Sequence, residues 1–67
     1  MLLNELIHAK FDIITLIIDM PENNLKNGMK GTIIDTYSQP YEAYEVEFCE
    51  GEGRTVAQLA LTLDQFE

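Results

Sequence analysis

The stretch from Leu25 to Tyr37 constrains the fold of this 67-residue chain more than any other. It contains an Asn27-Gly28 step, and glycine readily adopts the positive φ that many tight turns require. Gly31 then opens a run of β-branched residues, which favour strands. The pattern predicts a tight turn that leads into a strand, as in small, curled all-β proteins. It indicates a fold class and does not indicate a ligand.

Four short strands are expected along the chain, separated by turn-forming residues. They cover residues 10–18, 31–37, 44–49 and 54–61. In the third strand, Tyr44, Val46 and Phe48 alternate with polar or small residues, which is the period of a half-buried strand. The first strand is almost continuously apolar, which predicts burial on both faces or an end covered by the N-terminal segment.

The two ends of the chain have more than one interpretation. Residues 1–10 form a lead-in segment whose apolar spacing fits either a short helix or an extended chain, and residues 11–67 form the single domain. Residues 62–66 are expected to form one helical turn or a short closing strand, with Thr62 as an N-cap.

These elements together predict an all-β fold, a small SH3-like antiparallel barrel of four to five strands. Closure of such a barrel removes the exposed edges that would otherwise aggregate. An open meander completed by a partner's strand stays as the alternative. The short chain buries a limited core, so a homodimer or a complex with another protein also stays open.

The charge of the chain narrows the class of partner. Twelve acidic residues face four basic ones, which gives a formal net charge of -8. Nucleic-acid binding requires clustered lysine and arginine, and anionic membranes attract the same clusters, so neither partner is expected. A basic protein partner fits the sign of the charge, while acidity that serves solubility alone is the alternative.

Cysteine usage and hydropathy predict a cytoplasmic location. Cys49 is the single cysteine, so it forms no intrachain disulfide and builds no multi-cysteine metal site. The N-terminus lacks a basic segment with a cleavage site, and the apolar run at residues 13–18 is too short to span a bilayer. We expect no cofactor and no bound metal.

The sequence contains no arrangement that predicts catalysis. His8 is the single histidine, and nothing in the pattern places it beside Ser38 or Cys49. Glu45 and Glu47 share one strand face, but paired carboxylates act as acid and base in a cleft, and a chain of this size has little room for one. We therefore expect a protein that is not an enzyme.

The expected binding surface is the outward face of the third strand with its flanking loops. Acidic side chains would match basic residues of the partner, and Tyr37 and Tyr41 would supply buried aromatic area beside them. The predicted partner-binding residues are Tyr37, Tyr41, Glu42, Glu45, Glu47, Glu50 and Glu52.

Three segments of the chain resemble a known bacterial family in their order and spacing. They are residues 12–16 with 19–22, then 25–33, then 44–48 with 54–57. The most telling part is residues 17–22, where the family commonly has an acid, an apolar residue, proline and glutamate. The chain resembles the domain of unknown function 4926 family, common in cyanobacteria, over residues 11–66.

The resemblance implies an SH3-like barrel and transfers no catalytic motif. Genes of this family often lie beside those of other small proteins, some of them toxin-like, which implies a neutralising or accessory role. Residues 1–10 are longer than the typical lead-in of the family. We therefore expect a non-enzymatic interaction module that docks on a basic protein. The alternatives are an antitoxin or immunity protein and a structural accessory subunit of a larger enzyme complex.

Overall fold

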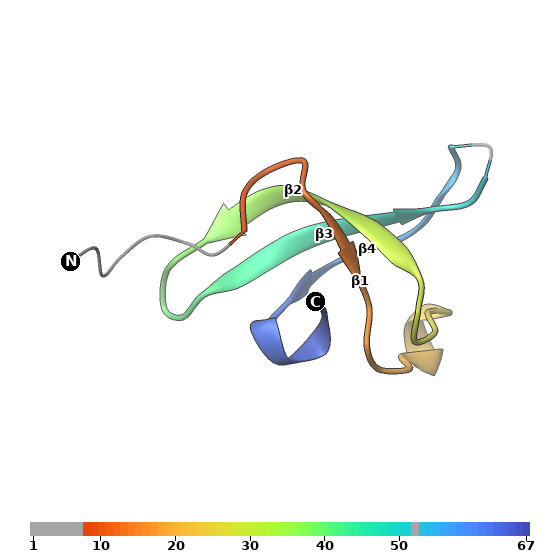
Figure 1. Ribbon diagram of the computed structural model, residues 1–67, viewed down its shortest axis with the longest axis horizontal. Coiled ribbons are helices and arrows are strands. Elements are labelled where there is room, and N and C mark those ends of the chain that lie inside the picture. The colour runs from red at the N-terminus through yellow and green to blue at the C-terminus, as the bar shows by residue number, and fades with distance from the viewer. Residues whose placement is uncertain (1–7, 52) are drawn as a thin grey trace.

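The computed structural model describes residues 8–51 and 53–67, which form one antiparallel sheet in the order β1-β2-β3-β4 (Figure 1). The strands are β1 (Ile13–Thr15), β2 (Lys30–Tyr37), β3 (Ala43–Cys49) and β4 (Thr55–Leu61), and two short 3-10 helices are η1 (Pro21–Asn23) and η2 (Leu63–Gln65). The expected all-β class is confirmed. An SH3-like barrel stays a prediction.

The inner face of β3 is the centre of the core. Tyr44, Val46 and Phe48 are each fully buried, as the alternation predicted. These three side chains belong to one hydrophobic core. Its other buried members come from β1, β2, β4, the β1–β2 connection and the C-terminal residues. They are Ile14, Leu16, Leu25, Ile33, Leu61 and Phe66. One continuous apolar cluster therefore lies under the inner face of the sheet.

Strand β1 is shorter than predicted. Phe11 has a φ of 73°, outside the extended region, so β1 begins only at Ile13. Ile13 is 63% exposed whereas Ile14 is buried, so the expected burial of both faces is wrong. Leu16 follows as an isolated bridge to Phe66. The apolar run therefore supplies alternate residues to the core, as a half-buried strand does.

A β-bulge divides β2 into two parts that face differently. Ile33 pairs with Val46, but the next pair joins Asp35 to Glu45, so Ile34 is an extra residue on the β2 side. Without the bulge, Asp35 would point to the same face as the buried Ile33. Because of the extra residue, Asp35 points to the outer face, and each later residue of β2 points to the face opposite to the one that simple alternation predicts.

Two glycines are required by the path of the chain into β2. Gly28 has a φ of 98°, which confirms the turn expected at Asn27-Gly28. A Cβ atom on Gly31 would lie 2.5 Å from Val46 Cγ1 and 2.8 Å from Phe48 Cε2. A glycine at position 31 therefore lets β2 pass closely over the core.

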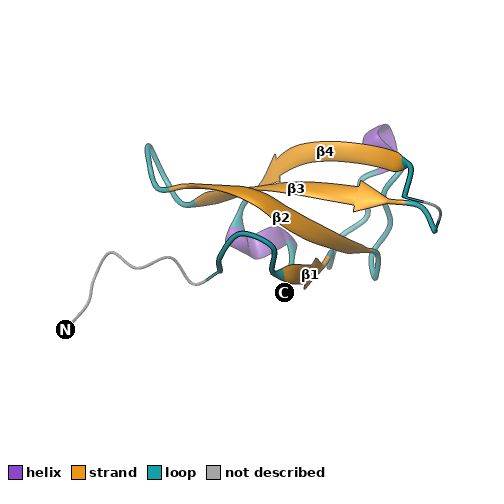
Figure 2. Cartoon of the chain, turned by 90° about the horizontal axis from the view of Figure 1, so that it is seen from above, coloured by secondary structure: helices purple, strands orange, loops and turns teal. Residues whose placement is uncertain are grey.

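The C-terminal residues form the expected helical turn as the 3-10 helix η2, and in place of a closing strand Phe66 makes an isolated bridge to Leu16. Thr62 is the N-cap of η2, and its N–H donates to Gln65 Oε1 at 2.9 Å. After η2 the chain returns to β1, where Thr15 and Glu67 exchange two backbone hydrogen bonds of 2.8 and 2.9 Å. The outer side of β1 is thereby paired by the C-terminus, which lies beside it in Figure 2.

His8 is the first described residue and contacts the core. Its ring lies 5.5 Å from the Tyr44 ring and 5.1 Å from the Phe66 ring, between centroids. The choice between a helix and an extended chain at the N-terminus concerns residues 1–7, which lie outside the described residues. Within the described part, no helix has the length and apolarity needed to cross a bilayer.

Candidate interaction surface

The outer face of the sheet carries a group of acidic residues on β2 and β3. Asp35 and Glu45 are direct cross-strand partners, and Glu47 lies two residues further along β3 on the same face. We call Asp35, Glu45 and Glu47 the outer acidic face. Like charges on directly opposed residues of a sheet repel each other, so this placement costs stability.

Neutral neighbours hold the carboxylates of the outer acidic face in place. Glu45 accepts hydrogen bonds from the Tyr37 hydroxyl at 3.3 Å and from Gln58 Nε2 at 3.2 Å. Glu47 accepts one from Thr55 Oγ1 at 2.7 Å. These bonds orient the carboxylates and leave their charges uncompensated.

Basic residues do not neutralise this face in the described part of the chain. The one ion pair found among residues 8–51 and 53–67 joins Arg54 Nε to Glu50 Oε1 at 3.5 Å. Lys30, on the same face of β2 near its start, donates its ammonium hydrogen to Thr15 Oγ1 at 2.7 Å. The outer acidic face therefore presents negative charge to solvent.

The environment of Tyr37 reflects this charge. Partial desolvation, followed by the carboxylates of Glu45 and Asp35, raises the pKa of the Tyr37 hydroxyl above its ordinary value. The hydrogen bond to Glu45 acts in the same direction, because the neutral hydroxyl donates it. Tyr37 is also 39% exposed, so part of its ring is available for contact.

The remaining described residues of the predicted set lie in the two turns that flank β3. Tyr41 is 63% exposed in the turn between β2 and β3. Glu42 is half-buried and accepts a hydrogen bond from the Tyr44 hydroxyl. Glu50 pairs with Arg54 at the β3–β4 turn, and Glu52 lies outside the described residues. The structure thus brings Tyr37, Glu45 and Glu47 together out of the predicted set.

Asp35 was missing from the predicted surface. Simple alternation from the buried Ile33 places Asp35 on the inner face, and the bulge at Ile34 reverses this. The sequence signal that was available is a charged residue at a position that alternation would bury. Such a conflict indicates a bulge.

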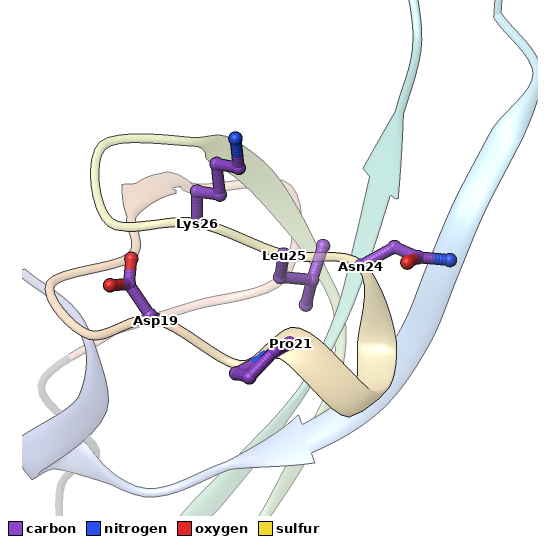
Figure 3. A pocket seen from close by; sticks show the side chains of 5 residues that line it. All are labelled: Asp19, Pro21, Asn24, Leu25 and Lys26. Atoms are coloured by element: carbon purple, nitrogen blue, oxygen red, sulfur yellow. The ribbon is translucent and has the colours of Figure 1, made fainter.

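A hollow of about 570 Å³ lies at the loop between β1 and β2 (Figure 3). The residues that line it are Asp19, Pro21, Asn24, Leu25 and Lys26. It offers one ammonium group, one carboxylate and one amide around an apolar floor. Its described lining includes no histidine, cysteine or hydroxyl side chain.

The loop that forms this hollow is closed on itself. The Asp19 carboxylate accepts a hydrogen bond from the Asn27 N–H at 2.9 Å, which joins the two arms of the loop. Met20 and Leu25 exchange backbone hydrogen bonds of 2.9 and 3.1 Å, and Pro21 begins η1 between them. The acid–apolar–proline motif at residues 19–21 therefore holds the two arms of the β1–β2 loop together.

The nucleophilic and metal-ligating side chains are scattered in the described structure. Cys49 is an exposed free thiol at the end of β3, and His8 packs on aromatic rings at the other side of the core. Among residues 8–51 and 53–67, no three histidine, cysteine or acidic side chains lie close enough together to hold a metal ion.

The fold and this surface define a class of protein: a small all-β domain with an acidic, tyrosine-flanked sheet face. The family described as Domain of unknown function (DUF4926) matches residues 10–67. The chain belongs to this family, as the sequence resemblance indicated. No curated protein and no solved structure matches the chain.

Proposed function

We propose that this protein is a non-enzymatic interaction module that docks on a basic protein through its outer acidic face. The observation that carries the proposal is the direct pairing of Asp35 with Glu45 in the absence of a basic neighbour in the described structure. Two opposed carboxylates repel each other in the free protein. A cationic side chain placed between them in a complex would relieve that repulsion.

Tyrosine side chains beside the face supply the apolar part of the interaction. Tyr37 is held against Glu45 by its hydroxyl, and its ring remains partly exposed. Tyr41 is exposed in the adjoining turn. Tyrosine buries a large area at low cost in side-chain entropy, so these two rings would add affinity to the charge attraction.

In this proposal, the protein meets its basic partner in the cytoplasm, and charge attraction brings the two together. Cys49 is a free thiol on the surface, which suits a reducing compartment. Complementary charge speeds the encounter and rejects acidic competitors. Salt at moderate concentration should therefore weaken the complex, because it screens the exposed charges.

The test is affinity capture from a lysate of the source cells with two matched variants. Glu45→Lys/Glu47→Lys reverses the outer acidic face, whereas Glu22→Lys/Glu67→Lys makes the same change of net charge at exposed sites elsewhere. We expect a stoichiometric basic protein on the unsubstituted chain and on the control. The Glu45→Lys/Glu47→Lys variant should lose it, and higher salt should release it.

Retention of that protein by Glu45→Lys/Glu47→Lys would overturn the proposed surface. A failure of the unsubstituted chain to retain any basic protein would overturn the proposed function. The identity of a captured protein would also distinguish a docking module from an antitoxin or an accessory subunit.

A further inference from the structure

The two edge strands of the sheet, β1 and β4, differ in the backbone hydrogen bonds on their outer sides. The outer side of β1 is paired with the C-terminus, where Thr15 bonds to Glu67 and the Ile17 N–H donates to Gln65 O at 3.0 Å. β4 is the last strand in the order and lies at the margin of the sheet in Figure 2. In the described structure, the backbone hydrogen bonds of residues 55–61 are those to β3.

The backbone groups that face this open edge follow from the ladder pattern. The Ile33 N–H and C=O both bond toward the β1 side, to Asp12 O and the Phe11 N–H. Backbone direction alternates along a strand, so the neighbouring Thr32 directs its groups toward Glu47 on β3.

The same alternation continues across β3 to β4. Because Glu47 bonds toward β2, Val46 bonds toward its β4 partner Leu59. Gln58 and Ala60 flank Leu59, so their N–H and C=O groups point away from β3 into solvent. The open edge therefore offers an alternating row of donors and acceptors.

Side-chain burial also shows that the edge is open. Val46 and Phe48, on the inner face of β3, have no exposed surface. Their β4 partners Leu59 and Ala57 belong to the same inner layer but remain partly exposed. A further strand beside β4 would cover them.

The composition of this edge is unusual for so acidic a chain. Residues 55–63 carry no charged side chain, and this is the longest charge-free run in a chain of net charge -8. The run also contains no proline and no glycine. Native edges are commonly protected by lysine, proline or a β-bulge. β4 has a bulge near its start, where Val56 is an extra residue, and the regular part of the edge, residues 57–61, has none of these protections.

We propose that β4 pairs with β4 of a second copy of this chain, antiparallel, to form a two-fold symmetric dimer. Two copies repel each other across most of their acidic surfaces, and the uncharged edge lets their backbones approach without opposed carboxylates. The pairing is isologous, so each edge satisfies the other. It stops at two copies because the β1 edge is already covered by the C-terminus.

The experiment compares solution mass by sedimentation equilibrium for the unsubstituted chain and two variants. Gln58→Lys/Ala60→Lys places lysines on adjacent outer positions of the edge strand. Lysines of the two copies oppose each other when the two-fold axis passes beside Gln58, Leu59 or Ala60, in the middle of the open edge. Ser38→Lys/Gln39→Lys adds the same charge in the exposed β2–β3 turn. We expect the unsubstituted chain and the control to show twice the 7.7 kDa chain mass.

The edge variant should dimerise more weakly by about tenfold or more, because like charges would face each other across the new ladder. Its β-sheet circular dichroism should be unchanged, since Gln58 and Ala60 lie beside Glu45, which favours added lysines. A monomeric unsubstituted chain at millimolar concentration would overturn the proposal. So would a dimer that the edge lysines leave intact. Neither result bears on Glu45 and Glu47 as a docking face.

Discussion

The two faces of β3 differ in both burial and charge. Tyr44, Val46 and Phe48 have no exposed surface, while Glu45 and Glu47, placed between them in the sequence, face solvent. The inner residues contribute packing, and the outer residues contribute charge that the described fold does not neutralise. Apolar packing and negative charge are therefore carried by alternate residues of one strand.

The energies on the two faces differ in scale. Full burial of a large apolar side chain contributes about 1.5–3 kcal/mol, whereas a cross-strand pair on an exposed face contributes about 0.2–1 kcal/mol. Substitutions on the inner face should therefore change the free energy of unfolding strongly. Substitutions on the outer face should change charge and binding with little effect on the fold.

The largest effect is expected from Val46→Asp. It places a carboxylate among buried apolar side chains with no partner, at a cost above about 4 kcal/mol, which is comparable to the total stability of so small a domain. The variant should be unfolded by circular dichroism. Glu47→Asp, which creates the same residue type one position on, should remain folded; a folded Val46→Asp protein would contradict the assignment of the inner face.

Gly31→Ala tests the inner face through packing alone. The added Cβ would approach Val46 and Phe48 closely, so we expect a loss of about 1–3 kcal/mol in the free energy of unfolding. Urea denaturation measures it. Gly51→Ala, where the added methyl meets nothing within 4 Å, is the control. Equal stability of the two variants would show that β2 does not cross the core so closely.

On the outer face, Glu45→Gln should stabilise the protein. It removes the repulsion from Asp35 and keeps an acceptor for Tyr37, and Gln58 can turn its amide oxygen toward the new NH2 group. The gain should be about 0.2–1 kcal/mol at low salt and should shrink as salt rises. Glu22→Gln, at an exposed site on η1, is the control. Thermal unfolding at two salt concentrations distinguishes them, and a loss of stability in Glu45→Gln would contradict the repulsive pair.

The smallest expected effect is on the titration of Tyr37. Its raised pKa means that the folded state favours the neutral hydroxyl. The stability that the neutral hydroxyl contributes is fully present below the ordinary pKa of 10.0 and is lost as pH rises through the folded-state pKa. In Glu45→Gln, the Tyr37 pKa should move down toward that ordinary value. Ring chemical shifts followed by NMR against pH measure this; an unchanged midpoint would mean that Glu45 does not act on the hydroxyl.

Local sequence patterns predicted the elements whose structure depends on neighbouring residues alone. The alternation at residues 44–49 located the inner face of β3, and Asn27-Gly28 located the turn before β2. Thr62 was correctly expected as an N-cap. Each of these depends on a side-chain period of two, a positive φ or a short capping contact, which a few consecutive residues determine.

Long-range pairing decided the parts that the patterns missed. The apolar run at residues 13–18 is compatible with a long buried strand, but Phe11 leaves the extended region and β1 has three residues. Its outer side is paired by Glu67, a residue far away in the sequence. No local pattern indicates which distant segment will cover an edge.

By itself, the sequence determined an all-β, acidic, single-cysteine chain with an inner face on β3, because composition and period are properties of consecutive residues. The tertiary structure decided where the charges gather. A bulge at Ile34 turned Asp35 to the outer face, opposite Glu45. A one-residue shift in a strand reverses every side chain beyond it, and such a shift exists only once β2 is paired with β3.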